Sequence, residues 1–225
     1  MIKTVKAVAL TVLVGAFPAV HAAEQIFEFV GKVTTSSVVG ANIGDLVTGT
    51  FRYDPDAATD TTVVGPPSSR VGIGLYAFNS PGSSLLSAQI GVHSVTSSAL
   101  EMTVYDNILG GGAGDSVEIS SGGSATVNGT NLAGASVGLL LTTDPGQTQV
   151  VESTDVPTSY DVNAFNFYGP ESSVGWLDLG QGPNGEQVWF SISNITPVPE
   201  PDVGVLTLLG MGALGMWAGR RRFRR

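Results

Sequence analysis

The sequence predicts an all-β protein, an antiparallel β-sandwich or jelly roll of about ten strands. Short runs rich in Val, Ile, Thr, Phe and Tyr alternate with polar or glycine positions, and Gly, Pro, Asn and Asp turn signals separate these runs. No long segment before residue 198 shows helical periodicity. Strands with one apolar and one polar face are typical of antiparallel sheets that pack against each other.

The N-terminus predicts an export signal. Lys3 and Lys6 form a basic start, an apolar stretch follows from residue 7, and Val20-His21-Ala22 ends in small residues as cleavage sites do. The apolar stretch of residues 7–20 is too short to span a bilayer, which argues against an uncleaved anchor. We therefore expect residues 1–22 to be a signal peptide that the secretory translocon handles and that is cleaved after Ala22.

The segment from residue 23 to residue 196 is expected to form one extracytoplasmic domain. Its length suits a single hydrophobic core. The predicted strands cover residues 25–34, 45–53, 69–78, 85–96, 99–106, 115–120, 124–128, 132–142, 160–168 and 187–195.

The charge of this domain excludes one class of partner. Between residues 23 and 198, Lys32, Arg52 and Arg70 stand against 17 Asp and Glu, a formal net charge of −14. Nucleic-acid binding requires a cationic surface toward phosphate, so no nucleic-acid partner is expected.

The scarcity of Cys and His limits the chemistry. The chain has no cysteine, which excludes disulfides and thiolate metal sites. After removal of the signal peptide His93 is the remaining histidine, so a catalytic triad would have to use it. Strand alternation from Gln89 to Thr96 predicts a partly exposed His93 on the opposite face from Ile90 and Val92.

The protein is expected to need no cofactor. Two acidic turns make calcium the one candidate. Asp54, Asp56 and Asp60 fall in one loop after a predicted strand, and calcium prefers carboxylate oxygens. Residues 111–115, Gly-Gly-Ala-Gly-Asp, are similar to a single copy of a calcium-binding nonapeptide repeat. Asp also favours turns that bind no metal, because its side chain bonds to nearby backbone, and this explanation is the favoured one for both segments.

Carbohydrate chemistry supplies two further alternatives. Trp176 and Trp189 would stack on sugar rings in a lectin-like module, but their apolar neighbours favour core packing or a plug at the end of the sheet. Glycoside hydrolysis uses paired carboxylates, but no spacing selects a pair among the acidic candidates. These candidates are Glu101, Glu118, Glu152, Glu171 and Glu186.

The C-terminal residues indicate a tail that is directed to the membrane. Residues 203–219 are apolar and would form a helix of about 25 Å, close to the thickness of a hydrocarbon core. Residues 220–225 contain Arg220, Arg221 and Arg222 and two further arginines, which the positive-inside rule places in the cytoplasm. By composition alone this tail predicts a plain single-span anchor.

Pro199-Glu200-Pro201, the short apolar span and the terminal arginine cluster together resemble the PEP-CTERM sorting signal of bacterial exported proteins. The resemblance covers residues 197–225. It implies an exosortase as partner, a membrane-embedded enzyme that would cleave near the tripeptide and pass the protein toward the cell surface.

Weaker motifs in the body also resemble a recurrent PEP-CTERM ectodomain, which implies a fold but no activity. The segments that carry this likeness are residues 29–33, 44–54, 103–107 and 175–177.

We therefore expect a non-enzymatic, exported structural protein of the cell surface or extracellular matrix. Its precursor would be anchored in the inner membrane through the C-terminal helix and would face the periplasm. Extracellular polysaccharide is the further partner considered. The alternative is a calcium-assisted carbohydrate-binding module, followed by a glycan-active enzyme.

Overall fold

The computed structural model describes residues 24–60, 72–79, 85–106, 114–143, 150–151, 153–165, 173–180 and 185–199. The expected signal peptide with its cleavage site at Ala22, the apolar span of residues 203–219 and the basic tail all lie outside these residues. Within the described ranges no helix has the length and apolar character needed to cross a membrane.

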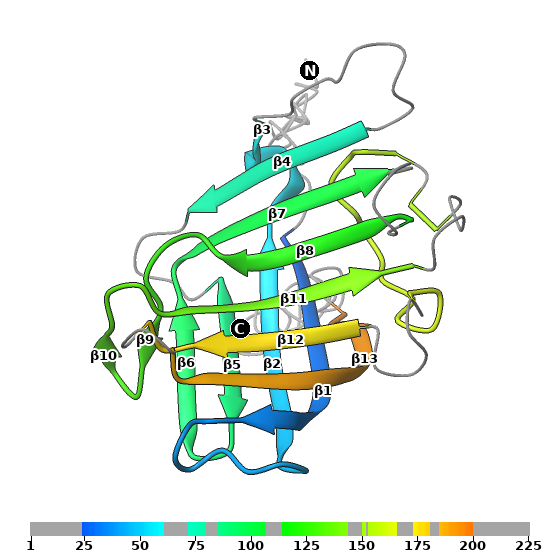
Figure 1. Cartoon of the computed structure of the whole chain (residues 1–225). Coiled ribbons are helices and arrows are strands. Elements are labelled where there is room, and N and C mark those ends of the chain that lie inside the picture. The colour runs from blue at the N-terminus through cyan, green and yellow to red at the C-terminus, as the bar shows by residue number, and fades with distance from the viewer. Residues whose placement is uncertain are drawn as a thin grey trace, which may run out of the picture.

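The described part of the chain is all-β, as predicted, and its strands form one antiparallel sheet (Figure 1). The strand order is β10-β9-β6-β5-β2-β1-β13-β12-β11-β8-β7-β4-β3. The strands are β1 (Gln25–Ser36), β2 (Leu46–Tyr53), β3 (Thr59–Asp60), β4 (Gly72–Asn79), β5 (Leu86–Ile90), β6 (His93–Ser97), β7 (Ala99–Asp106), β8 (Ser116–Ser121), β9 (Thr126–Val127), β10 (Thr130–Asn131), β11 (Ser136–Thr142), β12 (Ser173–Asp178) and β13 (Gln187–Pro197). A single 3-10 turn, η1 (Pro55–Ala57), lies between β2 and β3.

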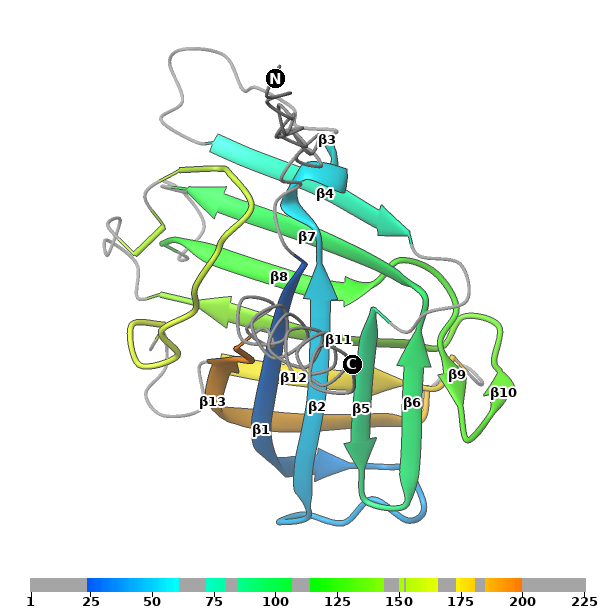
Figure 2. The same cartoon turned by 180° about the vertical axis from the view of Figure 1, so that it is seen from behind.

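The sheet curls so that it forms both layers of the fold. Strands β1, β2, β5 and β6 run crosswise behind the ladder of β13, β12, β11, β8, β7 and β4 in Figure 1, and Figure 2 shows the same crossing from behind. The prediction of two packed layers therefore needs one correction. The layers are halves of one continuous sheet rather than two separate sheets, because β1 pairs with β2 on one side and with β13 on the other.

The corner between the layers is made by the β1–β13 pair. Its register shifts twice, between Val30 and Gly31 and between Val33 and Thr35, and such bulges bend a strand and increase its twist. Gly31 lies at the first shift, where a Cβ atom would overlap the carbonyl oxygen of Ser191. The absence of a side chain at this position is what lets β1 and β13 approach.

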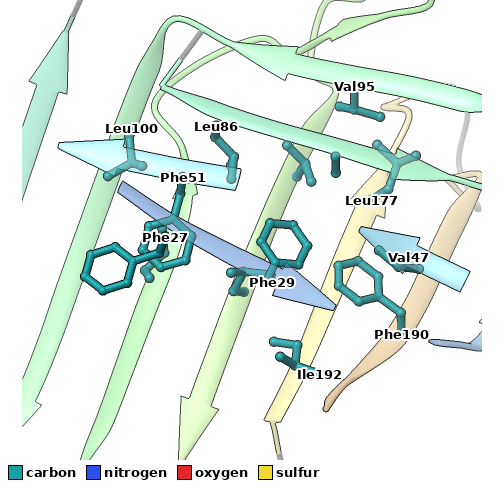
Figure 3. Packing of buried hydrophobic residues seen from close by; sticks show 14 of the residues in the cluster. Phe27, Phe29, Val47, Phe51, Leu86, Val95, Leu100, Leu177, Phe190 and Ile192 are labelled. Carbon is teal, nitrogen blue, oxygen red and sulfur yellow. The ribbon is translucent and has the colours of Figure 1, made fainter. Parts of the chain in front are cut away.

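Aromatic rings fill the space between the layers (Figure 3). Phe27 stacks on Phe51 with ring centroids 5.0 Å apart, and Phe29 lies nearly parallel to Phe190 at 6.3 Å. All four rings are fully buried. Gly175 faces the ring of Phe190, which occupies the place of a side chain there.

A segment without strands, residues 150–165, is tied to the rest of the fold by buried polar groups. The carboxylate of Asp115 accepts backbone N–H bonds from Val150 and Val151 at 3.0 and 2.9 Å. The hydroxyl groups of Tyr53 and Tyr160 lie 3.0 Å apart, and Tyr53 also donates to the carbonyl of Pro157. Burial raises the pKa of both tyrosines, so each stays a neutral hydroxyl.

Two predicted strands differ from the observed structure, and one observed strand of six residues was not predicted. Residues 85–96 form two strands, because Gly91 adopts a φ of 57° and, with Val92, makes the turn between β5 and β6. Residues 160–165 form turns in which the Asp161 side chain accepts the N–H of Asn163, and the remainder of predicted strand 160–168 is outside the described residues. Strand β12 was not predicted at all.

We expect Gly31→Ala to destabilise the protein by about 1–3 kcal/mol, the usual cost of overpacking, because the obstructing atom is a backbone oxygen within the corner pairing. Urea unfolding of the variant and of the wild type measures the difference. Val30→Ala is the matched control, since Val30 is partly exposed on the opposite face of the same strand, and it should cost less than about 1 kcal/mol. Equal stability of Gly31→Ala and wild type would contradict the role of this glycine.

Candidate functional site

The sorting segment begins where the sheet ends. Pro197, the last residue of β13, is paired with Phe27, and the Val198 N–H donates to the carbonyl of Ile26 at 2.8 Å. Pro199, the first residue of the tripeptide, is exposed. The body and the tripeptide are therefore joined without a linker, at the start of β1. Glu200, Pro201, Arg220, Arg221 and Arg222 lie outside the described residues.

One carboxylate of the acidic loop after β2, that of Asp54, has a structural role. Asp54 is the N-cap of η1, and its Oδ1 accepts the N–H of Asp56 at 3.0 Å. Asp60 pairs with Tyr76 through β3 and β4. Over the described ranges, no group of three or more His, Asp or Glu side chains is placed to hold a metal ion. The calcium prediction for Asp54, Asp56 and Asp60 therefore rests on the sequence alone.

Asp115, the acidic residue of the repeat-like segment 111–115, has no exposed carboxylate to offer a metal. It is fully buried and accepts two backbone N–H bonds from the segment that starts at Val150. Its role is to hold that segment, which is the same backbone-bonding use of Asp that turns show.

His93 is half-buried at the start of β6, so the predicted partial exposure is confirmed. The predicted face is wrong, because residues 91–92 form a turn and His93 is the direct cross-strand partner of Ile90. Its Nε2 lies 2.8 Å from the carbonyl oxygen of Val39, and its Nδ1 lies 3.3 Å from Nδ2 of Asn128. A carbonyl accepts and an amide nitrogen donates, so the ring carries its proton on Nε2. The two nitrogens thus connect the start of β6 to the β1–β2 loop and to the β9–β10 turn.

The outer face of the second layer carries a pair of tryptophans. Trp176 of β12 and Trp189 of β13 are direct cross-strand partners, with ring centroids 6.4 Å apart and planes inclined by 40°. The ring of Trp176 lies over Gly138 of β11, where a side chain would collide with it. We call Trp176, Trp189 and Gly138 the aromatic platform. Trp189 is 41% exposed and Trp176 is half-buried on the same outer face, so the expectation that they pack in the core is wrong.

The strand pairing continues from the platform to two carboxylates. Gly138 is paired with Ser120, and Ser120 with Glu101, so Glu101 belongs to the same cross-strand row as Trp176. Glu118 lies in the next row of the same face, paired with Leu140 and Thr103. Sequence spacing alone did not select these two of the five glutamate candidates. Glu186 lies between β12 and β13, and Glu152 and Glu171 are outside the described residues.

Glu101 and Glu118 repel each other across β7 and β8. Desolvation raises the pKa of Glu118, and the negative charge of Glu101 raises it further. In the part of the chain that the structure describes, the one salt bridge found joins Arg52 to Glu24 at 3.4 Å, in the other layer. The carboxylate pair therefore has no cationic partner among these residues.

Two hollows lie away from the aromatic platform. One, of about 450 Å³, opens on the outer face of β1, β2, β5 and β6 and is lined by hydroxyl groups, including Thr50 and Ser87 with their oxygens 2.7 Å apart. The other, of about 610 Å³, lies between β8 and residues 150–165. Neither is lined by Glu101, Glu118 or the two tryptophans.

Glu118→Gln should stabilise the protein at neutral pH by less than about 1 kcal/mol, because it removes a partly desolvated charge beside Glu101. A carboxyl group whose pKa is higher in the folded than in the unfolded state makes the protein less stable as the pH rises from the unfolded-state pKa to the folded-state pKa. The gain should therefore disappear below the ordinary glutamate pKa of 4.5. Melting temperatures between pH 4 and pH 8 test this, with Glu28→Gln in β1 as the control expected to change little. A lower melting temperature of Glu118→Gln at pH 7 would contradict the repulsion.

Comparison with known protein families identifies the C-terminal segment. Residues 197–222 match the PEP-CTERM protein-sorting motif. Comparisons with curated proteins and with solved structures give no match. The matched range starts at the last residue of β13 and includes the tripeptide and the apolar stretch. Residues 197–222 thus carry a PEP-CTERM protein-sorting motif, the type of signal that an exosortase recognises, directly after the β domain.

Proposed function

We propose that the β domain is a structural component of the cell surface or extracellular matrix and acts without catalysis. The observation that carries this proposal is the direct connection of the folded sheet to the sorting motif at Pro197. A precursor with residues 1–22 removed would be held in the inner membrane by residues 203–219 and would face the periplasm. An exosortase would then act near Pro199, Glu200 and Pro201 and pass the domain outward.

The fold supports release of an intact domain. Removing the chain after Val198 leaves every described strand complete, because β13 ends at Pro197 and its pairing with Phe27 lies before the tripeptide. The last backbone hydrogen bond described, from Val198 to Ile26, also lies before it. Processing at the tripeptide would therefore separate the domain from its anchor without breaking the sheet.

The carbohydrate-binding alternative has one observation in its favour, the exposed Trp189 beside the half-buried Trp176 on the outer face. Its calcium component has no comparable support from the described residues. The enzyme alternative is weaker, because Glu101 and Glu118 lie on an open strand face and line neither of the two hollows.

Topology is the first test of this function. A reporter that is active only in the cytoplasm, fused after Val198 in place of the tail, should be silent because residues 1–22 direct the domain out of the cytoplasm. The matched control lacks residues 1–22 and should be active. Activity of the first fusion in cells that also export a known secreted protein would contradict the proposed topology.

Processing is the second test. Replacing Pro199, Glu200 and Pro201 by alanine should make the full-length, membrane-bound form accumulate several-fold, while the circular dichroism of the domain stays unchanged. Immunoblotting of membrane and released fractions measures the ratio, and mass spectrometry gives the mature C-terminus. Alanines at Asn194 and Thr196, two exposed positions on β13, provide the control and should be processed normally. An unchanged mature C-terminus in the tripeptide variant would refute exosortase recognition at this site.

A further inference from the structure

The aromatic platform is not required by the core. On β13, Val188 and Phe190 are fully buried on the inner face, whereas Trp189 between them points to the opposite face. Trp189 is the largest of the exposed hydrophobic side chains found among the described residues. An exposed aromatic ring beside a second one is costly to leave in water and is typical of a binding surface.

The platform lies on an open strand face, and neither of the two hollows described above includes it. Its cross-strand row runs from Trp189 through Trp176 and Gly138 to Ser120 and Glu101. Neighbouring strands lie about 4.8 Å apart, so the row from Trp176 to Glu101 covers about 14 Å. A surface of this shape fits several consecutive units of a chain molecule lying across the strands, not a small molecule held in a pocket.

The negative charge of this outer face indicates which class of polymer it can bind. Glu101 and Glu118 add two carboxylates with no cation paired to either in the described part of the chain, and the body as a whole carries a formal charge of −14. An anionic polymer would be repelled. A cationic one would relieve the repulsion between the carboxylates and would also interact favourably with the faces of the two indole rings.

We propose that the outer face of β7, β8, β11, β12 and β13 binds a polysaccharide with free amino groups, whose sugar rings stack on Trp176 and Trp189 and whose amino groups approach Glu101 and Glu118. This inference deepens the proposed function and rests on it for the supply of an extracellular polysaccharide. Binding itself is a property of the folded face.

The test uses the full chain in detergent with Trp217→Phe, so that Trp176 and Trp189 are the remaining sources of tryptophan fluorescence. The probe is a glucosamine trisaccharide with free amino groups, compared with the N-acetylated trisaccharide and with a trisaccharide of uronic acid. We expect saturable quenching or a spectral shift with the amino form and at least tenfold weaker binding of the other two.

Two substitutions separate stacking from charge. Trp189→Ala should weaken binding of the amino form about tenfold, as loss of one aromatic contact would. Glu118→Gln should also weaken it while raising the melting temperature, a combination that a purely structural role would not produce. Glu28→Gln removes the same charge from the other layer and is the control for non-specific attraction to an acidic protein.

Three results would overturn the proposal: equal affinity for the amino and N-acetylated forms, unchanged affinity of Trp189→Ala, or an equal loss with Glu28→Gln. The proposed function is tested separately, by determining the mature C-terminus and by measuring release of the domain from the membrane. Normal processing without saccharide binding would reject this inference alone. Binding without processing would reject the sorting proposal alone.

Discussion

The double pairing of β1 is the constraint on which the rest of the structure depends. One edge of this strand bonds to β2 and the other to β13, so its twelve residues join the two layers of the fold. If that strand were straight and regular, the sheet would continue in one plane and its inner faces would not meet. The two register shifts on the β13 side bend the pair and bring Phe27 and Phe29 against the other layer.

Glycines make the aromatic core compatible with this corner. Gly31 admits the carbonyl of Ser191, Gly49 admits the ring of Phe29, and Gly175 admits the ring of Phe190. Each glycine gives up some strand propensity, and at Gly49 and Gly175 the loss is offset because a large ring is buried in the space. The same arrangement occurs on the outer face, where Gly138 lies beneath Trp176. At these three glycines the missing side chain leaves room for a ring against the strand.

Sequence reasoning succeeded where the information is local. Residue alternation identified β1, β2, β7 and β13 to within a few residues, and the sorting motif was recognisable because its elements are contiguous. It failed where the outcome depends on distant partners. Apolar and polar residues alternate from Tyr160 to Ala164 as in a strand. The hydroxyl of Tyr160 nevertheless meets Tyr53, more than a hundred residues away, and the segment turns at Asp161.

The sequence predicts the residue types of the candidate site but not their arrangement in space. Trp176, Trp189, Glu101 and Glu118 were all candidates from residue type alone, yet nothing in their spacing shows that they share a face. Their juxtaposition comes from the pairing of β12 with β13 and of β7 with β8, which are long-range register choices. The curl of the sheet has the same origin, because the extra residues at the corner leave no mark in the alternation pattern.

Strand β13 connects recognition with sorting. Its first part carries Trp189, and its last residue, Pro197, is where the sorting motif begins. Pro197 is eight positions after Trp189, a path of at most about 26 Å. With the tail in the membrane, the aromatic platform would be held away from the point of attachment by this length of paired strand. Because the pairing of β13 with β1 precedes the tripeptide, removal of the tail would leave the platform in its position on the sheet. The same face would then be available before and after release, so the domain would not need to refold to bind its ligand outside the cell.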